Sequence, residues 1–240
     1  MSLDEPFTVA GVDGCPGGLW VVVTARYQST TEPDLVALEV GVVADLAPLV
    51  DTLRAGALQA IAIDMPIGLL ADRPRASDRE ARRLLGPRRA SVFPTPSRAV
   101  LRAGDYAEAC ALSRAACGKA ISKQTFHLLD RIRHLDELVE PSDQDRLVEA
   151  HPEMAFTRLN TGFVTSTKHT AEGRRFRRDL LHRELAPSLV DAVVESRVAP
   201  VADLLDACVL VTTARRVTTG DAVRVGSDID PTGKRADIAY

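Results

Sequence analysis

The sequence has few of the residues that build sulfur-based metal sites or disulfide frameworks. Only four of its 240 residues are cysteines, no two of them form a Cys-x-x-Cys pair, and none has a histidine at zinc-finger spacing. This excludes a zinc finger or ribbon and a disulfide scaffold, and it is typical of a reducing compartment. The four are Cys15, Cys110, Cys117 and Cys208.

Long apolar runs, aromatic residues and an excess of positive charge are lacking too. No apolar run approaches the ~20 residues of a membrane helix, and the acidic start of the chain lacks the basic-then-apolar order of a signal peptide. We therefore expect a cytoplasmic protein with no membrane partner. The net charge is −3 and aromatic content is 4%, so binding to nucleic acid requires local basic patches rather than bulk charge or extensive base stacking.

The pattern of apolar runs predicts an α/β fold. Three leading strands are joined by tight turns, and the later strands are separated by helices, which is typical of a mixed five-stranded sheet flanked by helices. On periodicity alone, an ordinary doubly wound sheet is an equal alternative. We expect a single domain over residues 1–240, with a mainly helical and loop insertion over about residues 70–145. The predicted strands are residues 8–12, 19–24, 35–43, 60–64 and 146–150, with a short strand near Ile238.

Helical periodicity and capping residues predict the helices. Ser77 and Glu80 fit a capping box that starts a helix at Asp78, and Ser122 caps a longer helix with an apolar stripe from Phe126 to Leu138. The other predicted helices are residues 44–54, 106–117, 154–159, 170–185 and 201–216.

Three acidic residues lie where predicted strands end. Asp13 follows the first strand, Asp64 ends the fourth and Glu149 lies in the fifth. Ligands of open α/β sheets gather beyond such strand ends, so these carboxylates would face one crevice if the strands are neighbours. The alternative for Asp13 is a turn-forming role before glycine, and for Asp64 an Asx turn or a helix cap.

Asp203 and Asp206 lie three residues apart in a helix that is apolar nearly all round. They share one face, and the helix should be largely buried. Burying carboxylates without a cation costs several kcal/mol or makes them neutral, so we expect either a divalent metal or an arginine partner. Asp203 has the further alternative of a first-turn helix acid, whereas Asp206 lies too deep in the helix for that.

Carboxylate oxygens alone select hard ions, Mg²⁺ or Mn²⁺, and two such ions can activate a water for phosphodiester hydrolysis. The glycine-rich turn at residues 14–18 lacks the Gly-Lys-Ser/Thr ending of a phosphate-binding loop, so no nucleotide-cofactor site is predicted. His151 in its loop is a candidate general base with a structural role as the alternative, whereas Glu153 follows a proline and is predicted to be a first-turn helix acid. The predicted metal ligands are Asp13, Asp64, Glu149, Asp203 and Asp206, of which all but Asp203 are also predicted to be catalytic.

Several long motifs resemble one family, the domain of unknown function 429, whose members are described as predicted nucleases of the ribonuclease-H-like superfamily. The resemblance begins with Gly-Val-Asp-Gly-Cys-Pro-Gly-Gly and covers nearly the whole chain. It implies a ribonuclease-H-like fold, with Asp13 as central metal ligand and Asp64 and Asp206 beside it. One departure is Ala202, where we expect many relatives to carry a further acid. The matching motifs are residues 11–18, 63–69, 78–82, 85–86, 91–96, 122–124, 149–153, 203–207 and 233–240.

Basic and polar residues outside the acidic motifs are candidate contacts for nucleic-acid phosphates. One group lies on a predicted helix and the loop after it, and another at the start of a helix, where backbone amides favour an anion. A second arginine run, at residues 174–178, has the alternative of a solvated helix face. The predicted substrate contacts are Arg79, Arg88, Arg89, Lys123 and Gln124.

Three functions remain open on the sequence. The leading hypothesis is a metal-dependent nuclease that binds nucleic acid. A phosphotransferase of the actin and sugar-kinase type is a second hypothesis, because those enzymes place phosphates on a glycine-containing first hairpin. A non-catalytic nucleic-acid-binding or scaffold protein is the third. The oligomeric state stays open, with a homodimer among the alternatives.

Overall fold

The computed structural model describes residues 5–30 and 34–240, and these form two compact units. Unit 1 comprises the described part of Met1–Asp64, with Asp145–Val223 and Ala239–Tyr240, and unit 2 comprises Met65–Gln144 and Arg224–Ile238. The insertion predicted over about residues 70–145 corresponds in position to the first segment of unit 2.

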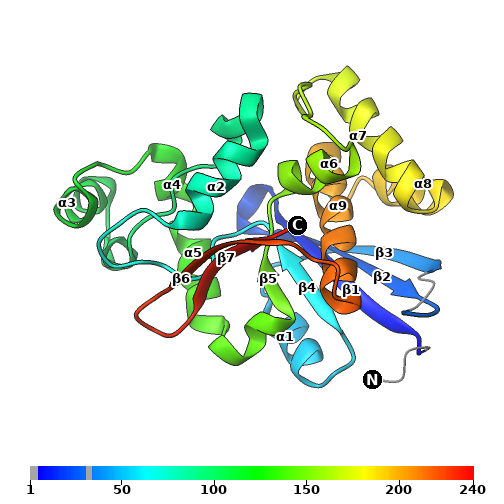
Figure 1. Cartoon of the computed structure of the whole chain (residues 1–240), viewed down its shortest axis with the longest axis horizontal. Coiled ribbons are helices and arrows are strands. Elements are labelled where there is room, and N and C mark those ends of the chain that lie inside the picture. Colours follow the sequence, from blue (N-terminus) through cyan, green and yellow to red (C-terminus); the bar gives the residue numbers. More distant parts are fainter. Residues whose placement is uncertain (1–4, 31–33) are drawn as a thin grey trace. The chain divides into compact units, whose positions relative to one another are not determined.

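Unit 1 is built on a five-stranded mixed sheet in the order β3-β2-β1-β4-β5 (Figure 1). Strand β2 pairs antiparallel with β1 and with β3, whereas β4 pairs parallel with β1 and with β5, so β2 alone runs against the other four. This order and these directions confirm the predicted ribonuclease-H-like sheet. The strands are β1 (Phe7–Gly14), β2 (Trp20–Tyr27), β3 (Leu35–Val43), β4 (Ala60–Ile63) and β5 (Leu147–Glu149).

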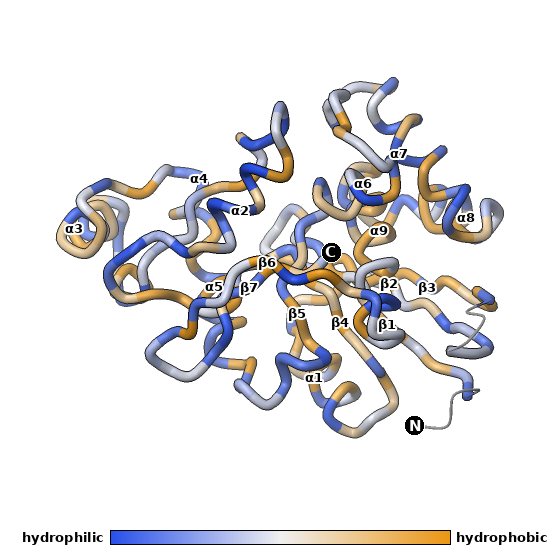
Figure 2. Tube along the Cα trace, in the orientation of Figure 1, coloured by the Kyte–Doolittle hydropathy of each residue, from blue (hydrophilic) through white to orange (hydrophobic). Residues whose placement is uncertain are grey.

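Helix α9 (Val201–Thr219) packs along one face of this sheet, against β1, β2 and β4. Alternate strand residues such as Val9, Val23 and Ala62 form one core with the apolar side chains of α9. Figure 2 shows the mainly hydrophobic course of α9 and β4. Helices α6, α7 and α8 pack against α9. Their bounds are Pro152–Leu159, Ala171–Glu184 and Pro187–Glu195, and α1 of the same unit is Ala47–Arg54.

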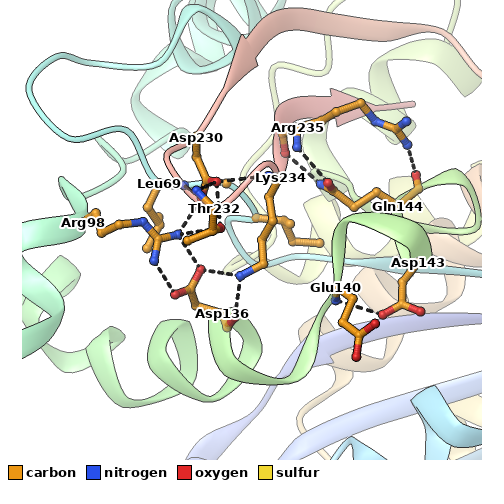
Figure 3. A network of polar contacts seen from close by, with 12 residues as sticks. Leu69, Arg98, Asp136, Glu140, Asp143, Gln144, Asp230, Thr232, Lys234 and Arg235 are labelled. Atoms are coloured by element: carbon orange, nitrogen blue, oxygen red, sulfur yellow. Dashed lines mark hydrogen bonds and ion pairs between the residues drawn. The ribbon is translucent and has the colours of Figure 1, made fainter.

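Unit 2 combines four helices with a two-stranded sheet. Figure 3 shows the polar network that ties its segments together: Arg98 donates to Asp136 and Asp230, and Lys234 donates to Asp136. Burial alone would raise the pKa of Asp230, but hydrogen bonds from Thr232, Leu69 and Arg98 lower it to about 2. The elements are α2 (Ala76–Leu85), α3 (Tyr106–Cys117), α4 (Lys123–His127), α5 (Leu129–Leu138), β6 (Arg224–Ile229) and β7 (Arg235–Ala239).

Two helix predictions are wrong in detail. Helix α2 starts at Ala76 rather than Asp78, because the carboxylate of Asp228 accepts from the Ala76 amide at 2.7 Å and caps the helix in place of a Ser77 capping box. The long helix predicted from Ser122 divides into α4 and α5 at Leu128, although Ser122 is its N-cap as predicted. Helix α8 was not predicted.

Over the residues that are described, no helix is long and apolar enough to cross a membrane.

Candidate functional site

The parallel pairing of β1 with β4 brings Asp13 and Asp64 to the same edge of the unit 1 sheet. Val12 pairs with Ile63, so the residues that follow them are in register on one face. The Asp64 amide donates to the Val12 carbonyl at 3.0 Å, and this bond extends the ladder to the level of the two carboxylates. The Asp13 carboxylate itself accepts from the Gly14 amide at 2.7 Å.

Gly11 allows α9 to approach β1 closely enough to add Asp206 to this pair. A Cβ at Gly11 would overlap the carbonyl oxygen of Ala207 and lie 2.6 Å from the Val211 nitrogen. Asp13 points to the same sheet face as Gly11, two residues earlier, and Asp206 directly precedes Ala207. The first glycine of the sequence motif thus has a packing role that juxtaposes the two acids.

Burial raises the pKa of each of these carboxyl groups. Asp13 is only 6% exposed, and desolvation followed by the charges of Asp64 and Asp206 raises its pKa well above the usual value. Desolvation raises the pKa of Asp64 as well. Asp206 is 2% exposed, and its pKa rises to about 6 by desolvation, although Lys168 opposes the shift. The raised pKa values indicate that these three carboxylates have too little positive charge around them.

Lys168 supplies a cation to the group. Its ammonium donates to Asp206 Oδ2, and its own pKa is raised by the charges of Asp206, Asp13 and Asp64 against the effect of its burial. We call Asp13, Asp64, Asp206 and Lys168 the acid cluster. Asp203, three residues before Asp206 in the first turn of α9, also raises the pKa of Asp13.

The structure does not bring Glu149 into the acid cluster. Glu149 pairs with Ile63 rather than with Asp64, so its side chain points to the opposite face of the sheet. The His151 Nδ1 accepts from the Glu153 amide at 3.2 Å and caps α6. Both residues also act on the acid cluster, because His151 lowers the pKa of Asp64 and Glu153 raises it. Arg177 is fully buried, and its Nη2 donates to both carboxylate oxygens of Glu153, at 2.8 Å to Oε1 and 3.0 Å to Oε2.

The five predicted substrate contacts all belong to unit 2. Four of them, Arg79, Arg89, Lys123 and Gln124, are exposed, and Arg88 is partly buried. Lys123 and Gln124 start a helix of only five residues. In unit 1, three arginines of the run at residues 174–178 have structural partners, and the fully buried Arg177 does not fit the alternative of a solvated helix face. Arg174 donates to the His169 carbonyl, Arg177 to Glu153 and Arg178 to Asp191.

Sequence reasoning missed Lys168. It is one of four lysines in the chain and lies in an irregular segment between α6 and α7, with no spacing that relates it to the acids. One indirect signal was present in the sequence: buried carboxylates of the apolar helix, Asp203 and Asp206, were expected to need a cation, either a divalent metal or an arginine.

The donor chemistry of the acid cluster fits a hard divalent cation. Asp13, Asp64 and Asp206 offer carboxylate oxygens only, the ligands that Mg²⁺ and Mn²⁺ prefer. Their raised pKa values indicate that the single ammonium leaves them under-neutralised. Within residues 5–30 and 34–240, no three His, Cys, Asp or Glu side chains are already arranged to hold an ion. Side-chain rotation would therefore accompany binding.

A family model described as "Protein of unknown function (DUF429)" matches residues 11–230, from the Gly11 that admits α9 to the Asp230 of the unit 2 network. The chain belongs to this family. The resemblance seen in the motifs is confirmed, and the acid cluster of this DUF429 protein lies wholly within the matched residues.

Among solved structures, the DUF429 chain is similar to "Thermus thermophilus RuvC structure", with 12% sequence identity and a TM-score of 0.33, over 90% of this chain and 98% of that one. A likeness of this size is no guide to activity. No curated protein matches the chain.

Proposed function

We propose that this chain is a divalent-metal-dependent nuclease that hydrolyses phosphodiester bonds in nucleic acid. One observation carries the proposal: three aspartates from β1, the end of β4 and α9 are gathered at one sheet edge with raised pKa values and a single lysine among them. Three crowded carboxylates, of which Asp13 and Asp206 are buried and Asp64 is partly buried, oppose folding, so a structure that keeps them together favours a role that needs their charge.

In this proposal Asp13, Asp64 and Asp206 hold Mg²⁺ or Mn²⁺, and Asp203 adds negative charge from one turn away. The metal, when bound, polarises a phosphodiester and lowers the pKa of a water. The protein's own contribution is rigidity and low dielectric. Asp13 is fixed on the central strand, and Asp206 on a helix whose neighbours Leu205 and Ala207 are fully buried, so neither carboxylate backbone has to reorganise.

Nucleic acid is the proposed substrate, and its proposed phosphate contacts are Arg79, Arg88, Arg89, Lys123 and Gln124. The four cationic side chains would neutralise phosphates and Gln124 would donate a hydrogen bond, in both cases without reading sequence. Neutralising several phosphates makes affinity fall steeply as salt rises. Aromatic residues are few, which favours backbone contacts over base stacking.

Cleavage of a labelled panel of single-stranded, double-stranded and branched DNA and RNA, with Mn²⁺ or Mg²⁺, tests the proposal. We expect wild-type activity to fall by at least 100-fold in Asp13→Asn and in Asp206→Asn. Asp51→Asn removes an exposed carboxylate of α1 and serves as the matched control with unchanged activity. Equal rates in wild type and Asp13→Asn would trace the cleavage to a contaminant and refute the proposal, as would no cleavage of any substrate by a metal-saturated wild type.

A further inference from the structure

Lys168 lies among the carboxylates on a segment that is held in place by contacts with α7. It lies in the segment between α6 and α7, and its ammonium contacts Asp206 while its charge also lowers the pKa of Asp13 and of Asp64. Its side chain is 29% exposed, so water reaches one side of it while Asp206, only 3% exposed, lies on the other.

The backbone on both sides of Lys168 is anchored to α7. Arg177 donates to the Ser166 carbonyl at 3.2 Å, and Arg174 donates to the His169 carbonyl at 2.9 Å. A Cβ at Gly173 would overlap the Thr167 carbonyl oxygen, so the segment lies directly on the helix surface. Arg177 is in turn fixed by Glu153, so its support of this segment is rigid.

We propose that Lys168 is a resident cation that takes the place of one of two divalent ions, so that the acid cluster binds one divalent ion per chain. The inference rests on the proposed function, because it presupposes that the aspartates bind metal. Charge balance supports it. With Asp203 counted, the carboxylates of Asp13, Asp64, Asp203 and Asp206 carry four negative charges when ionised, and two divalent ions without Lys168 would balance them. Lys168 already supplies one positive charge, so a second ion beside it would leave the site with excess positive charge before substrate binds.

Counting bound Mn²⁺ in the absence of nucleic acid tests this inference without any activity measurement. Calorimetry and electron paramagnetic resonance of free Mn²⁺ give the number of ions per chain for wild type, Lys168→Met and Lys168→Arg. We expect one ion in wild type, two in Lys168→Met and one in Lys168→Arg, which keeps the charge. Lys119→Met removes the charge of an exposed lysine of unit 2 and should leave the count at one.

The folded state of each variant is checked by the fluorescence of Trp20, the only tryptophan, which is buried in unit 1. Should Lys168→Met not fold, Lys168→Gln retains a donor for Asp206 without charge and takes its place in the count. Two ions in wild type, or one ion in both Lys168→Met and wild type, would overturn the inference while leaving the proposed function intact. No ion in wild type would overturn the proposed function and the inference with it.

Discussion

Replacing Asp206 by asparagine is expected to stabilise the metal-free protein at pH 8. Burial raises the pKa of Asp206 from 3.8 to about 6 in the folded protein. The unfolded chain loses this proton near pH 3.8, whereas the folded chain keeps it until about pH 6, so stability falls as the pH rises through that window. A difference of about two pKa units at 1.36 kcal/mol each gives a penalty of about 3 kcal/mol above pH 6.

The asparagine side chain removes this penalty because it is neutral at every pH. Its amide oxygen remains an acceptor for Lys168, which is partly exposed and can complete its hydration. At ~2–4 °C per kcal/mol for a chain of this size, the melting temperature should rise by about 6–12 °C at pH 8.

Thermal unfolding in the presence of a chelator, followed by Trp20 fluorescence, measures this effect in unit 1. Trp20 is 1% exposed and pairs with Gly14, next to Asp13 in β1. The rise in melting temperature caused by Asp206→Asn should shrink as the pH falls from 8 to 4. Asp51→Asn, the exposed control, should show no such rise. An Asp206→Asn protein that is less stable than wild type at pH 8, or an advantage that does not depend on pH, would refute the reasoning.

Three further predictions concern the surroundings of the acid cluster. Gly11→Ala should destabilise the protein by ~1–3 kcal/mol or more and weaken Mn²⁺ binding, because a Cβ at Gly11 pushes α9 away from β1. Gly41→Ala is the control, since there is open space around its Cβ. Equal melting temperatures for Gly11→Ala and wild type would contradict the packing argument. Glu149→Gln should leave Mn²⁺ affinity within twofold of wild type in calorimetry, because its side chain is on the other sheet face; a tenfold loss would return Glu149 to the site. Arg177→Met should cost about 3–5 kcal/mol in chemical denaturation because it removes both Arg177 hydrogen bonds from the buried Glu153 carboxylate, and Arg177→Met with Glu153→Gln should recover part of that loss.

The sheet was predictable from the sequence because its signals are local. Alternating or continuous apolar runs mark β1 to β5, and the predicted bounds of β3 agree with the structure to the residue. Asp13 and Asp64 were predictable for the same reason, since each follows such a run directly. The pairing of these acids required β1 and β4 to be neighbours, and the strand order confirms it.

Features that depend on the register of distant segments could not be read from the sequence. Glu149 follows an apolar run as Asp64 does, yet a one-residue difference in pairing turns it to the opposite face. The cap of α2 comes from Asp228, which lies 152 residues later. Lys168 reaches Asp206 across 38 residues of chain through backbone contacts that no local pattern reports. The close approach of α9 at Gly11 belongs to the same class.

Titration of Mn²⁺ into wild type and Asp13→Asn by calorimetry at pH 8 tests most directly whether the acid cluster is a metal site. The proposal predicts saturable binding to wild type in the micromolar to low millimolar range and at least a tenfold loss of affinity in Asp13→Asn, with Asp51→Asn unchanged. Binding of equal strength to wild type and Asp13→Asn, or no binding to wild type at millimolar Mn²⁺, would contradict it.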